Sequence, residues 1–498
     1  MPASSRGPTD RTLRLLARLS DDATTLADRM AQTSIELCAA GGDPAAEIAL
    51  ALAATLLLRL EDAAPRLHLH VPANRSISLP RLADVPLVEA LAKEHEGFRS
   101  IERLTDQPAP NPRLRLVFGG ADGGVPVQVS GWSCAIGQQL PLAPGNVLAA
   151  AFAGVLASIE AFKAALISAG SPAQIRPWRE VVSLWDLSLS AAAGPHSIEP
   201  VDLSGTAMVG CGGIASATAW TLALLPLTGR PILVDHDQID REGTNLNRHL
   251  TASYADLRKD KANLTASLLA RAGASPEAHT ERWQALPSAI RGTIRDALVT
   301  VDDDPTRRAV QLDLPRLILN AGTSDDGLYQ VTRHDFVNGA CLGCIARADL
   351  RSSGPEESAA QRLEIPLDDL RPYLMSSDPL PDELLSRARL QPEERALLAD
   401  TPGRHLVRRV CAEFRVTPTG PAVSAPMLSA APGVLLAAEA VKRTLRADTP
   451  LSERTNTLMA SFLRGPHGQW LRGRVKQPNC DCTEPAYLAR FQQKWELG

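Results

Sequence analysis

A glycine-rich turn near the middle of the chain is the first candidate for chemistry. The segment AMVGCGGIASATAW, residues 207–220, places Gly210, Gly212 and Gly213 between a short apolar run and an apolar helix. A strand, a glycine turn and a helix in succession present backbone N–H groups to a phosphate. Asp235 ends the next apolar run, at the place of a ribose-binding acid. The turn and the acid alone are compatible with NAD, FAD or ATP.

Charged and amide residues downstream favour ATP over a dinucleotide. The chain has seven lysines, and two of them belong to this stretch. Hydride transfer does not need a second set of cations beside the phosphates. The departure of pyrophosphate from ATP needs such cations, because negative charge accumulates on the phosphates. The residues of this stretch are Asp237, Asn245, Asn247, Arg248, Lys259 and Lys261.

An acidic cluster in VDDDPTRR follows another predicted strand. Asp302, Asp303 and Asp304 stand where one or two carboxylates and phosphate oxygens together would bind Mg²⁺. Any one of these charged groups, taken alone, is equally compatible with a solvated loop. Their order along the chain favours a nucleotide site.

This ordered set resembles the ThiF-like superfamily, which contains the ubiquitin-activating (E1-like) enzymes and the adenylyltransferases of sulfur-carrier proteins. The shared order is G-x-G-G, D-x-D, N-x-x-R, K, D-x-x-x-T-R and C-x-x-C. It covers residues 206–347, resumes at 425–445 and reaches 480–482. The resemblance implies an α/β, Rossmann-like fold. It also implies that Mg-ATP is used to adenylate the C-terminal glycine of a ubiquitin-like protein.

The resemblance also implies individual roles. Asp302 fits the Mg²⁺-binding aspartate best because Thr306 and Arg307 complete the motif, and Asp304 is the alternative. The segment before Asn245 is longer than the family spacing, so we expect the loop to bulge, with Asn247 as an alternative contact. Arg248, Lys261 and Asp302 are expected to be catalytic. The implied ATP-binding residues are Gly210, Gly212, Gly213, Asp235, Asp237, Asn245, Arg248, Lys261 and Asp302.

Four of the eight cysteines form two short pairs. They are Cys341 and Cys344 in ACLGCIA, and Cys480 and Cys482 in NCDCTEP. Four thiolates supplied as two pairs suit a tetrahedral Zn²⁺, although the C-x-C spacing is tighter than usual. A redox dithiol is the alternative, but no thioredoxin-like context surrounds the first pair. We expect a structural zinc that ties the end of the chain to the adenylation domain.

Cys411 is the predicted nucleophile for a thioester. The resemblance implies a catalytic cysteine between the zinc pair and the late apolar helix, and Cys411 is the one cysteine in that interval. Arg408 and Arg409 beside it would favour the thiolate. A buried structural cysteine is the alternative, because neighbouring apolar residues give the segment an apolar face.

Two apolar helices share a pattern that predicts an internal repeat. Residues 154–166 and 433–445 both fit G-V-L-x-x-x-E-A-x-K-x-x-L. We therefore expect two Rossmann-like ThiF-type folds, the first of them inactive because RLHLHVPA has no aspartate where PILVDHD has one. Residues 11–60 are expected to be helical with a break at 38–44. The predicted parts are an inactive domain at 1–195, an active domain at 196–350 with 425–475, a catalytic-cysteine insertion at 351–424 and a zinc-completing tail at 476–498.

Composition narrows the expected partners. The net charge of −4 gives no reason to expect nucleic acid or a membrane, and no uninterrupted apolar run is of membrane-spanning length. We expect a cytoplasmic protein that binds a ubiquitin-like protein and an E2-like conjugating enzyme, as in bacterial antiviral-defence operons. The repeat predicts a monomeric pseudo-dimer, with Arg11 or Arg14 reaching the ATP of the second copy. The alternatives are a sulfur-carrier adenylyltransferase, an NAD-linked oxidoreductase and a non-catalytic scaffold.

Overall fold

The computed structural model forms two compact units, a larger one from residues 1–343 with 423–498 and a smaller one from residues 344–422. We refer to residues 1–195 as the first half of the larger unit and to its remaining residues as the second half. The structure describes residues 11–17, 19–20, 22–39, 42–71, 80, 85–120, 123–171, 175–195, 198, 200–240, 245–323, 327–345, 356, 359–360, 363–374, 376, 378–388, 390, 392–403, 406, 425–445, 451, 455–466, 470–478 and 480–495.

The first half contains a seven-stranded sheet with the order β3-β2-β1-β4-β5-β6-β7. Its first five strands in that order pair in parallel, and β6 and β7 are antiparallel additions at one edge. The strands are β1 (Ser34–Ala39), β2 (Arg66–His70), β3 (Leu104–Thr105), β4 (Leu114–Phe118), β5 (Val125–Ser130), β6 (Ser133–Ile136) and β7 (Val182–Ser183).

The second half contains an eight-stranded sheet with the order β12-β11-β9-β13-β14-β15-β16-β17. Five parallel strands are again followed by antiparallel ones, so the two sheets have corresponding strand orders. The strands are β9 (Thr206–Val209), β11 (Ile232–Val234), β12 (Glu277–His279), β13 (Asp296–Val299), β14 (Leu317–Thr323), β15 (Leu328–His334), β16 (Thr457–Ser461) and β17 (Leu471–Arg472), with β8 (Val201–Asp202) and β10 (Leu227–Thr228) paired separately.

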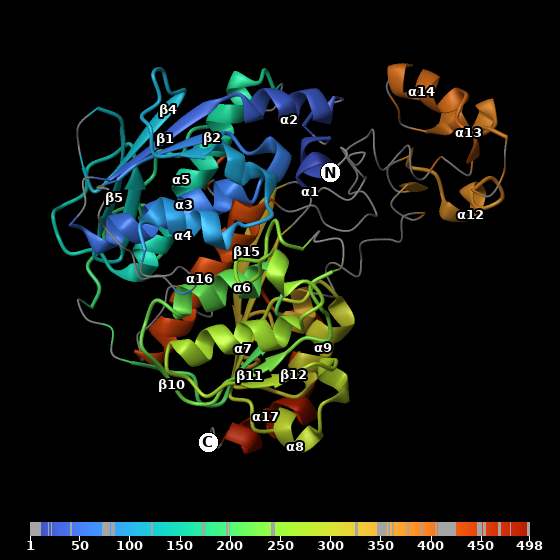
Figure 1. Cartoon of the computed structure of the whole chain (residues 1–498). Helices are drawn as coiled ribbons and strands as arrows, with labels where there is room; N and C mark the ends of the chain where they lie inside the picture. The colour runs from blue at the N-terminus through green and yellow to red at the C-terminus, as the bar shows by residue number, and fades with distance from the viewer. Residues whose placement is uncertain are drawn as a thin grey trace. The chain divides into compact units, whose positions relative to one another are not determined.

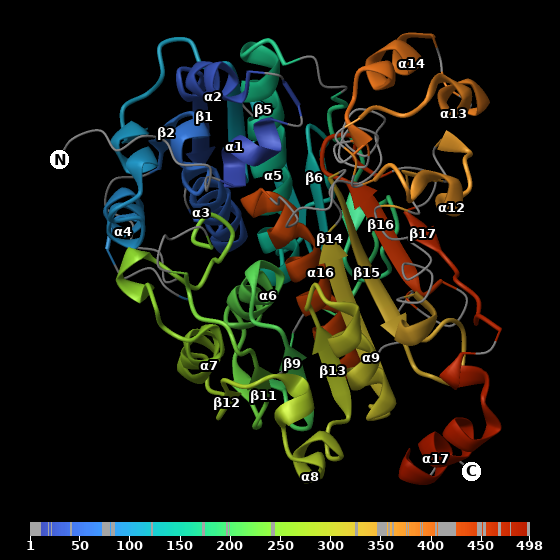
Figure 2. The same cartoon turned by 90° about the vertical axis from the view of Figure 1, so that its right-hand side faces the viewer.

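Helices cover both sheets and meet between them. Figures 1 and 2 show α3 and α5 beside the first sheet and α6 and α16 beside the second, and α16 packs on α5. The helices of the larger unit are α1 (Arg11–Leu16), α2 (Ala23–Ala31), α3 (Pro44–Leu58), α4 (Leu87–Glu94), α5 (Val147–Ser168), α6 (Gly213–Leu222), α7 (Lys261–Arg271), α8 (Ser288–Arg291), α9 (Asp304–Leu312), α16 (Pro426–Thr444) and α17 (Pro485–Trp495).

The pattern shared by the two apolar helices occupies matching places in the fold. A Cβ on Gly154 would lie 2.5 Å from a backbone oxygen of α3, and a Cβ on Gly433 would lie 2.5 Å from a backbone oxygen of α6. Both positions therefore need glycine for close helix packing. The Glu and Lys of the pattern form buried ion pairs in both helices, Glu160 with Lys163 and Glu439 with Lys442.

One expectation from the sequence is corrected in the first half. Residues 34–39 form the central strand β1, whereas the sequence predicts a helix over 34–37 and a break from 38. A short apolar run does not distinguish a buried strand from a buried helix by periodicity, and here pairing with β2 and β4 decides. By length and composition α5 could cross a membrane, although Glu160 and Lys163 interrupt its apolar run, and 83% of its most apolar window is buried inside the fold. Such burial is typical of a helix in the core of a unit that contains two sheets.

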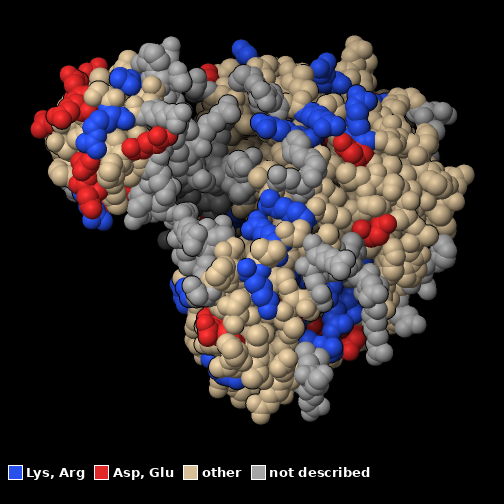
Figure 3. Space-filling view, turned by 180° about the vertical axis from the view of Figure 1, so that it is seen from behind, with Lys and Arg blue, Asp and Glu red and all other residues tan. Residues whose placement is uncertain are grey.

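The smaller unit has its own small apolar core. Its described helices are short, and leucines such as Leu370, Leu385 and Leu398 pack together inside it. Figure 3 shows acidic side chains gathered on its surface, where Asp368, Asp382 and neighbouring residues are exposed. Such a surface does not favour binding of a nucleic-acid backbone. The helices are α12 (Leu367–Leu370), α13 (Asp382–Arg387) and α14 (Pro392–Ala399).

Candidate functional site

The glycine turn joins β9 to α6 at the carboxyl end of the parallel strands. Gly210 has a φ of +87°, and a Cβ there would lie 3.0 Å from the backbone nitrogen of Val301, so only glycine fits. Gly212 is the N-cap of α6, and no side chain in the described part of the chain caps that helix. The first N–H groups of α6 are therefore not committed to a capping side chain, as a phosphate-binding turn requires.

Asp235 lies at the end of β11 and binds the backbone of the turn. Its carboxylate accepts hydrogen bonds from the N–H of Cys211 at 2.6 Å and from the N–H of Asp237 at 2.8 Å. Burial raises the pKa of Asp235 above its ordinary value, against the effect of these two hydrogen bonds. The carboxylate is thus fixed beside the turn, where a ribose hydroxyl could donate to it.

The segment after Asn245 packs directly on the glycine turn. A Cβ on Gly213 would lie 3.1 Å from both the Cγ and the carbonyl oxygen of Arg248, so this arginine crosses the start of α6. The ring Nε2 of His249 lies 2.8 Å from the carbonyl oxygen of Cys211. The N–H of Leu250 donates to Ser216 Oγ at 3.0 Å. Arg248, the predicted phosphate contact, therefore lies against the glycine turn.

Lys261 begins α7 and pairs with Asp237. Its Nζ donates to Asp237 Oδ2 at 2.8 Å, and its backbone N–H donates to the Asp237 carbonyl at 3.0 Å. Burial by itself would raise the pKa of Asp237, but the hydrogen bond and charge of Lys261, together with His236 and Arg282, hold that pKa below its ordinary value. The Lys261 side chain is 8% exposed, so its ammonium is held at a defined place.

The acidic cluster after β13 divides into three different roles. Asp303 accepts the N–H of Thr306 and caps α9, while Asp304 pairs with Arg307 at 2.9 Å. Asp302 is exposed and forms no hydrogen bond or ion pair with the residues that the structure describes. The Thr300 hydroxyl donates to the Gly210 carbonyl at 2.9 Å, which places this strand end against the glycine turn. Asp302 is thus the carboxylate of the three that is not used structurally.

The two candidate asparagines differ in environment. The Asn245 N–H donates to Asp240 at 3.2 Å, whereas Asn247 is 6% exposed and both polar atoms of its amide have no partner in the described structure. Residues 241–244, where the bulge is expected, lie outside the described residues. The sequence motifs assign no role to His249, although it contacts the glycine turn. Its position directly after Arg248 was the one available signal.

The four predicted zinc ligands meet in one buried cluster. The sulfur atoms of Cys341, Cys344, Cys480 and Cys482 all lie within 4.8 Å of one another, and those of Cys341 and Cys480 are 3.5 Å apart. Tetrahedral Zn²⁺ with bonds of about 2.3 Å would hold its sulfurs about 3.8 Å apart. None of the four is in a disulfide among the described residues. The donor set and its spacing therefore fit a tetrahedral zinc.

Comparison with known proteins identifies the family. The model of the ThiF family matches residues 189–484, more than half of the chain. The chain belongs to the ThiF family. A curated relative, the uncharacterized protein y4jF of Sinorhizobium fredii, is 28% identical over 408 residues, which are 78% of this chain and 76% of that protein.

Solved structures of Escherichia coli MccB are similar to the chain at lower sequence identity than y4jF. MccB with selenomethionine-labelled MccA has a TM-score of 0.37 at 16% identity, covering 58% of this chain and 68% of MccB. MccB with ATP has a TM-score of 0.36 at 15% identity, covering 72% of this chain and 98% of MccB.

The ThiF match contains the second sheet, the smaller unit and the cysteine cluster, whereas the first sheet precedes it. The predicted nucleophile Cys411 is inside the match but outside the described residues. The side chains of Arg11 and Arg14 are likewise outside the described set.

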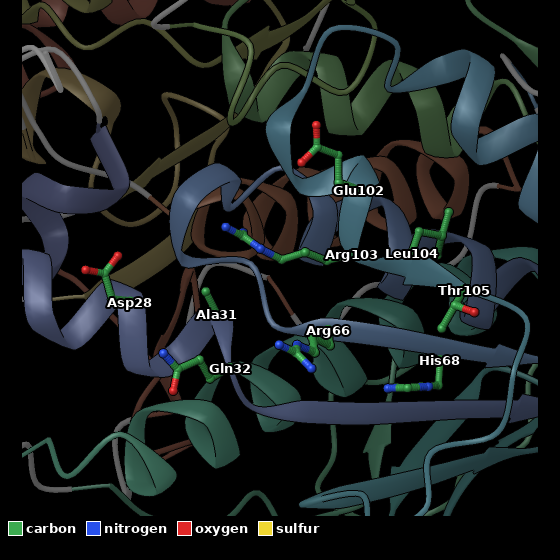
Figure 4. Close-up of a pocket in the computed structure, with 9 residues that line it drawn as sticks. All are labelled: Asp28, Ala31, Gln32, Arg66, His68, Glu102, Arg103, Leu104 and Thr105. Atoms are coloured by element: carbon green, nitrogen blue, oxygen red, sulfur yellow. The ribbon is translucent and has the colours of Figure 1, made fainter. Parts of the chain in front are cut away.

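A pocket in the first half is separate from the ThiF-type site. It has a volume of about 670 Å³. Figure 4 shows its lining side chains on α2, β2 and the segment around β3, and none of them is a predicted ATP contact. This pocket and the glycine turn are therefore two separate features of the larger unit.

Proposed function

We propose that this ThiF-family protein uses Mg-ATP to adenylate the C-terminal glycine carboxylate of a ubiquitin-like protein. One observation carries the nucleotide assignment. Four separate segments converge on or beside one uncapped glycine turn. They are the end of β11, the segment after Asn245, the start of α7 and the end of β13. These segments carry Arg248 and Lys261 and the carboxylates of Asp235, Asp237 and Asp302, which supports binding of a triphosphate with Mg²⁺ at this turn. A dinucleotide would leave Arg248, Lys261 and Asp302 without a use.

The proposed reaction exchanges the phosphoanhydride bond between the α- and β-phosphates for a mixed anhydride between the carrier carboxylate and the α-phosphate. A carboxylate oxygen of the carrier attacks the α-phosphorus of ATP, the bond to the β,γ-phosphates breaks, and pyrophosphate leaves with the electron pair. Arg248 and Lys261 stabilise the charge that accumulates on the phosphates. Asp302 would hold Mg²⁺, which neutralises phosphate charge when bound. Lys261 must exchange its bond to Asp237 for the phosphates, and Asp237 is exposed enough to be solvated when released.

We further propose that the first sheet is an inactive copy of the same fold. Its counterpart of the glycine turn begins α3, where the Asp43 carboxylate accepts the N–H of Ala45 and Glu47 accepts that of Gly42. Two acidic groups thus occupy the place where phosphate would bind, and their charge would repel it. The connection between β4 and β5 is only residues 119–124, where the second sheet has Asp302 and α9. Residues 1–195 then form the inactive domain, and residues 196–350 with 425–475 the active one.

Pyrophosphate exchange tests adenylation. We expect the purified protein to incorporate labelled pyrophosphate into ATP when a ubiquitin-like protein with a C-terminal glycine is added. A carrier that lacks its last glycine is the control, because the attacking carboxylate is then misplaced. If none of the small ubiquitin-like proteins encoded beside this chain supports exchange over the control, the adenylation proposal is wrong.

The second proposed step is thioester formation on Cys411. Its thiolate attacks the carbonyl carbon of the acyl-adenylate, the bond from that carbon to the phosphate oxygen breaks, and AMP leaves. An E2-like conjugating enzyme would then accept the acyl group by thiol exchange. The family match across residues 189–484 includes the segment that carries Cys411.

The variant Cys411→Ala separates the two steps. We expect it to retain pyrophosphate exchange and to lose a carrier adduct that is visible on gels and removed by thiol reductant. Cys38→Ala, in the first half, serves as the matched control and should keep the adduct. If the adduct persists in Cys411→Ala, another residue is the nucleophile. If the wild type exchanges pyrophosphate without any adduct, the protein is an adenylyltransferase of the sulfur-carrier type.

A further inference from the structure

A buried arginine of the first half binds the loop that carries Arg248. Arg59 follows α3, and its side chain is fully buried. Its guanidinium donates to the carbonyl of Leu246, to that of His249 at 3.0 Å and to that of Ala252 at 2.9 Å. All three acceptors belong to the second half. One side chain therefore fixes the course of the backbone on both sides of Arg248.

Two other groups of the first half hold Arg59 in place. Its Nη2 lies 3.8 Å from Glu94, at the end of α4, and its guanidinium stands 5.3 Å from the centre of the Phe98 ring. A buried guanidinium requires both a counter-charge and hydrogen-bond acceptors. Glu94 supplies the charge, and the loop carbonyls supply acceptors. The first half thus carries a cation whose two terminal nitrogens, Nη1 and Nη2, donate hydrogen bonds to the loop.

The contact around Arg59 is a packed interface between the halves. The side chains of Phe98, Ile239, Leu246 and Ala252 form one apolar cluster. The rings of Phe98 and Tyr254 meet edge to face at 5.1 Å, and the Tyr254 hydroxyl donates to Glu61 at 3.2 Å. The described part of the loop is therefore held against the first half at residues 246, 249, 252 and 254.

The opposite side of the same loop faces the glycine turn. His249 and Leu250 bond to Cys211 and Ser216, and Arg248 packs on Gly213. The loop lies between Arg59 and the turn, so a shift of its carbonyls would move Arg248 away from α6. Without Arg59, three carbonyls would lose their donor in a buried place, and the loop would rearrange to regain hydrogen bonds.

We propose that Arg59 is the positioning residue through which the first half keeps the second half competent to bind ATP. The first half then acts on the nucleotide site by shaping its loop from behind, whether or not it also supplies a side chain to the phosphates. This inference rests on the proposed use of ATP at the glycine turn.

The test compares Arg59→Met with a matched variant, Arg103→Met. Arg103 also donates to three carbonyls, at 2.9, 3.3 and 3.2 Å, but these belong to Glu61, Asp62 and Ala64 of its own half. Two quantities are measured on the full chain: the affinity for Mg²⁺ with a non-hydrolysable ATP analogue, by calorimetry, and backbone hydrogen–deuterium exchange across residues 245–252 without nucleotide. Arg59→Met should weaken the affinity about tenfold or more and raise deuterium uptake in that loop. Arg103→Met should change neither.

The affinity and loop uptake of Arg59→Lys should fall between those of the wild type and Arg59→Met. An ammonium keeps the charge but not the planar arrangement of N–H donors that reaches the three carbonyls. If Arg59→Met does not fold, Arg59→Lys and Glu94→Gln provide the same two measurements. Unchanged affinity and unchanged loop uptake in a folded Arg59 variant overturn the inference. If the wild type binds no nucleotide, the proposed function fails instead, and loop uptake alone then decides the role of Arg59.

Discussion

Asp302→Asn is expected to lower the rate of carrier-dependent pyrophosphate exchange by about a hundredfold or more. The substitution keeps the size of the side chain and removes its charge. Asp302 is exposed beside the glycine turn and has no hydrogen bond or ion pair in the described part of the chain. The substitution should therefore change the free energy of unfolding little. The loss should appear in kcat and in the dependence of the rate on Mg²⁺, because the carboxylate is proposed to hold that ion.

Its two neighbours are built-in controls. Asp303→Asn keeps an N-cap residue at the start of α9, since asparagine caps helices as well as aspartate does. Asp304→Asn removes only the partly exposed ion pair with Arg307. Both variants should keep exchange near the wild-type rate. If Asp304→Asn loses exchange and Asp302→Asn does not, the Mg²⁺ assignment moves to Asp304.

Removal of the proposed zinc is expected to destabilise the protein strongly. Metal analysis of the wild type should find a single zinc per chain, and Cys480→Ser should lose it and lower the Tm by roughly 10 °C. The physical reason is that the cluster joins Cys341 and Cys344 to a segment far along the chain. Without metal, four buried thiols have only weak hydrogen bonds with which to hold the two segments together.

Cys38→Ser is the control for zinc, because Cys38 lies in β1, far from the cluster in sequence and in the other half of the unit. It should keep the metal. In Cys480→Ser the helix α17 should still pack on the larger unit, because it has contacts of its own. Phe491 stacks on Phe336, and the Lys494 ammonium donates to the Asp313 carbonyl at 2.7 Å. Wild-type protein that is purified without added metal, contains no zinc and has an unchanged Tm after chelation would exclude a structural zinc.

The sequence indicated the family and much of the geometry of the site because its signals are local. Gly210, Asp235 and Lys261 each stand at the end of an element, where strand and helix boundaries are marked by glycine and charge. Parallel strands bring such ends together at one edge of the sheet, so order along the chain is enough to predict their meeting. The four cysteines are a similar case, because thiol pairs are rare in any chain and have few uses.

The contacts between the halves could not be predicted in this way. Arg59 follows an apolar helix, in a segment with no motif, and its partners are backbone carbonyls that leave no trace in residue type. The strand β1 was missed for a related reason, since its sequence SIELCA suits a buried helix equally well and only pairing with β2 and β4 selects the strand. Long-range packing decided both features.

The packing of α16 on α5, together with the contacts of Arg59, joins two halves of one polypeptide. An interface between separate subunits dissociates on dilution, and a site completed across it loses occupancy with it. Covalent connection removes that dependence, because the effective concentration of one half at the other is set by the chain and not by the amount of protein in the cell. The loop of residues 245–252 would thus stay in place against the first half even in a cell that holds only a few copies of the protein.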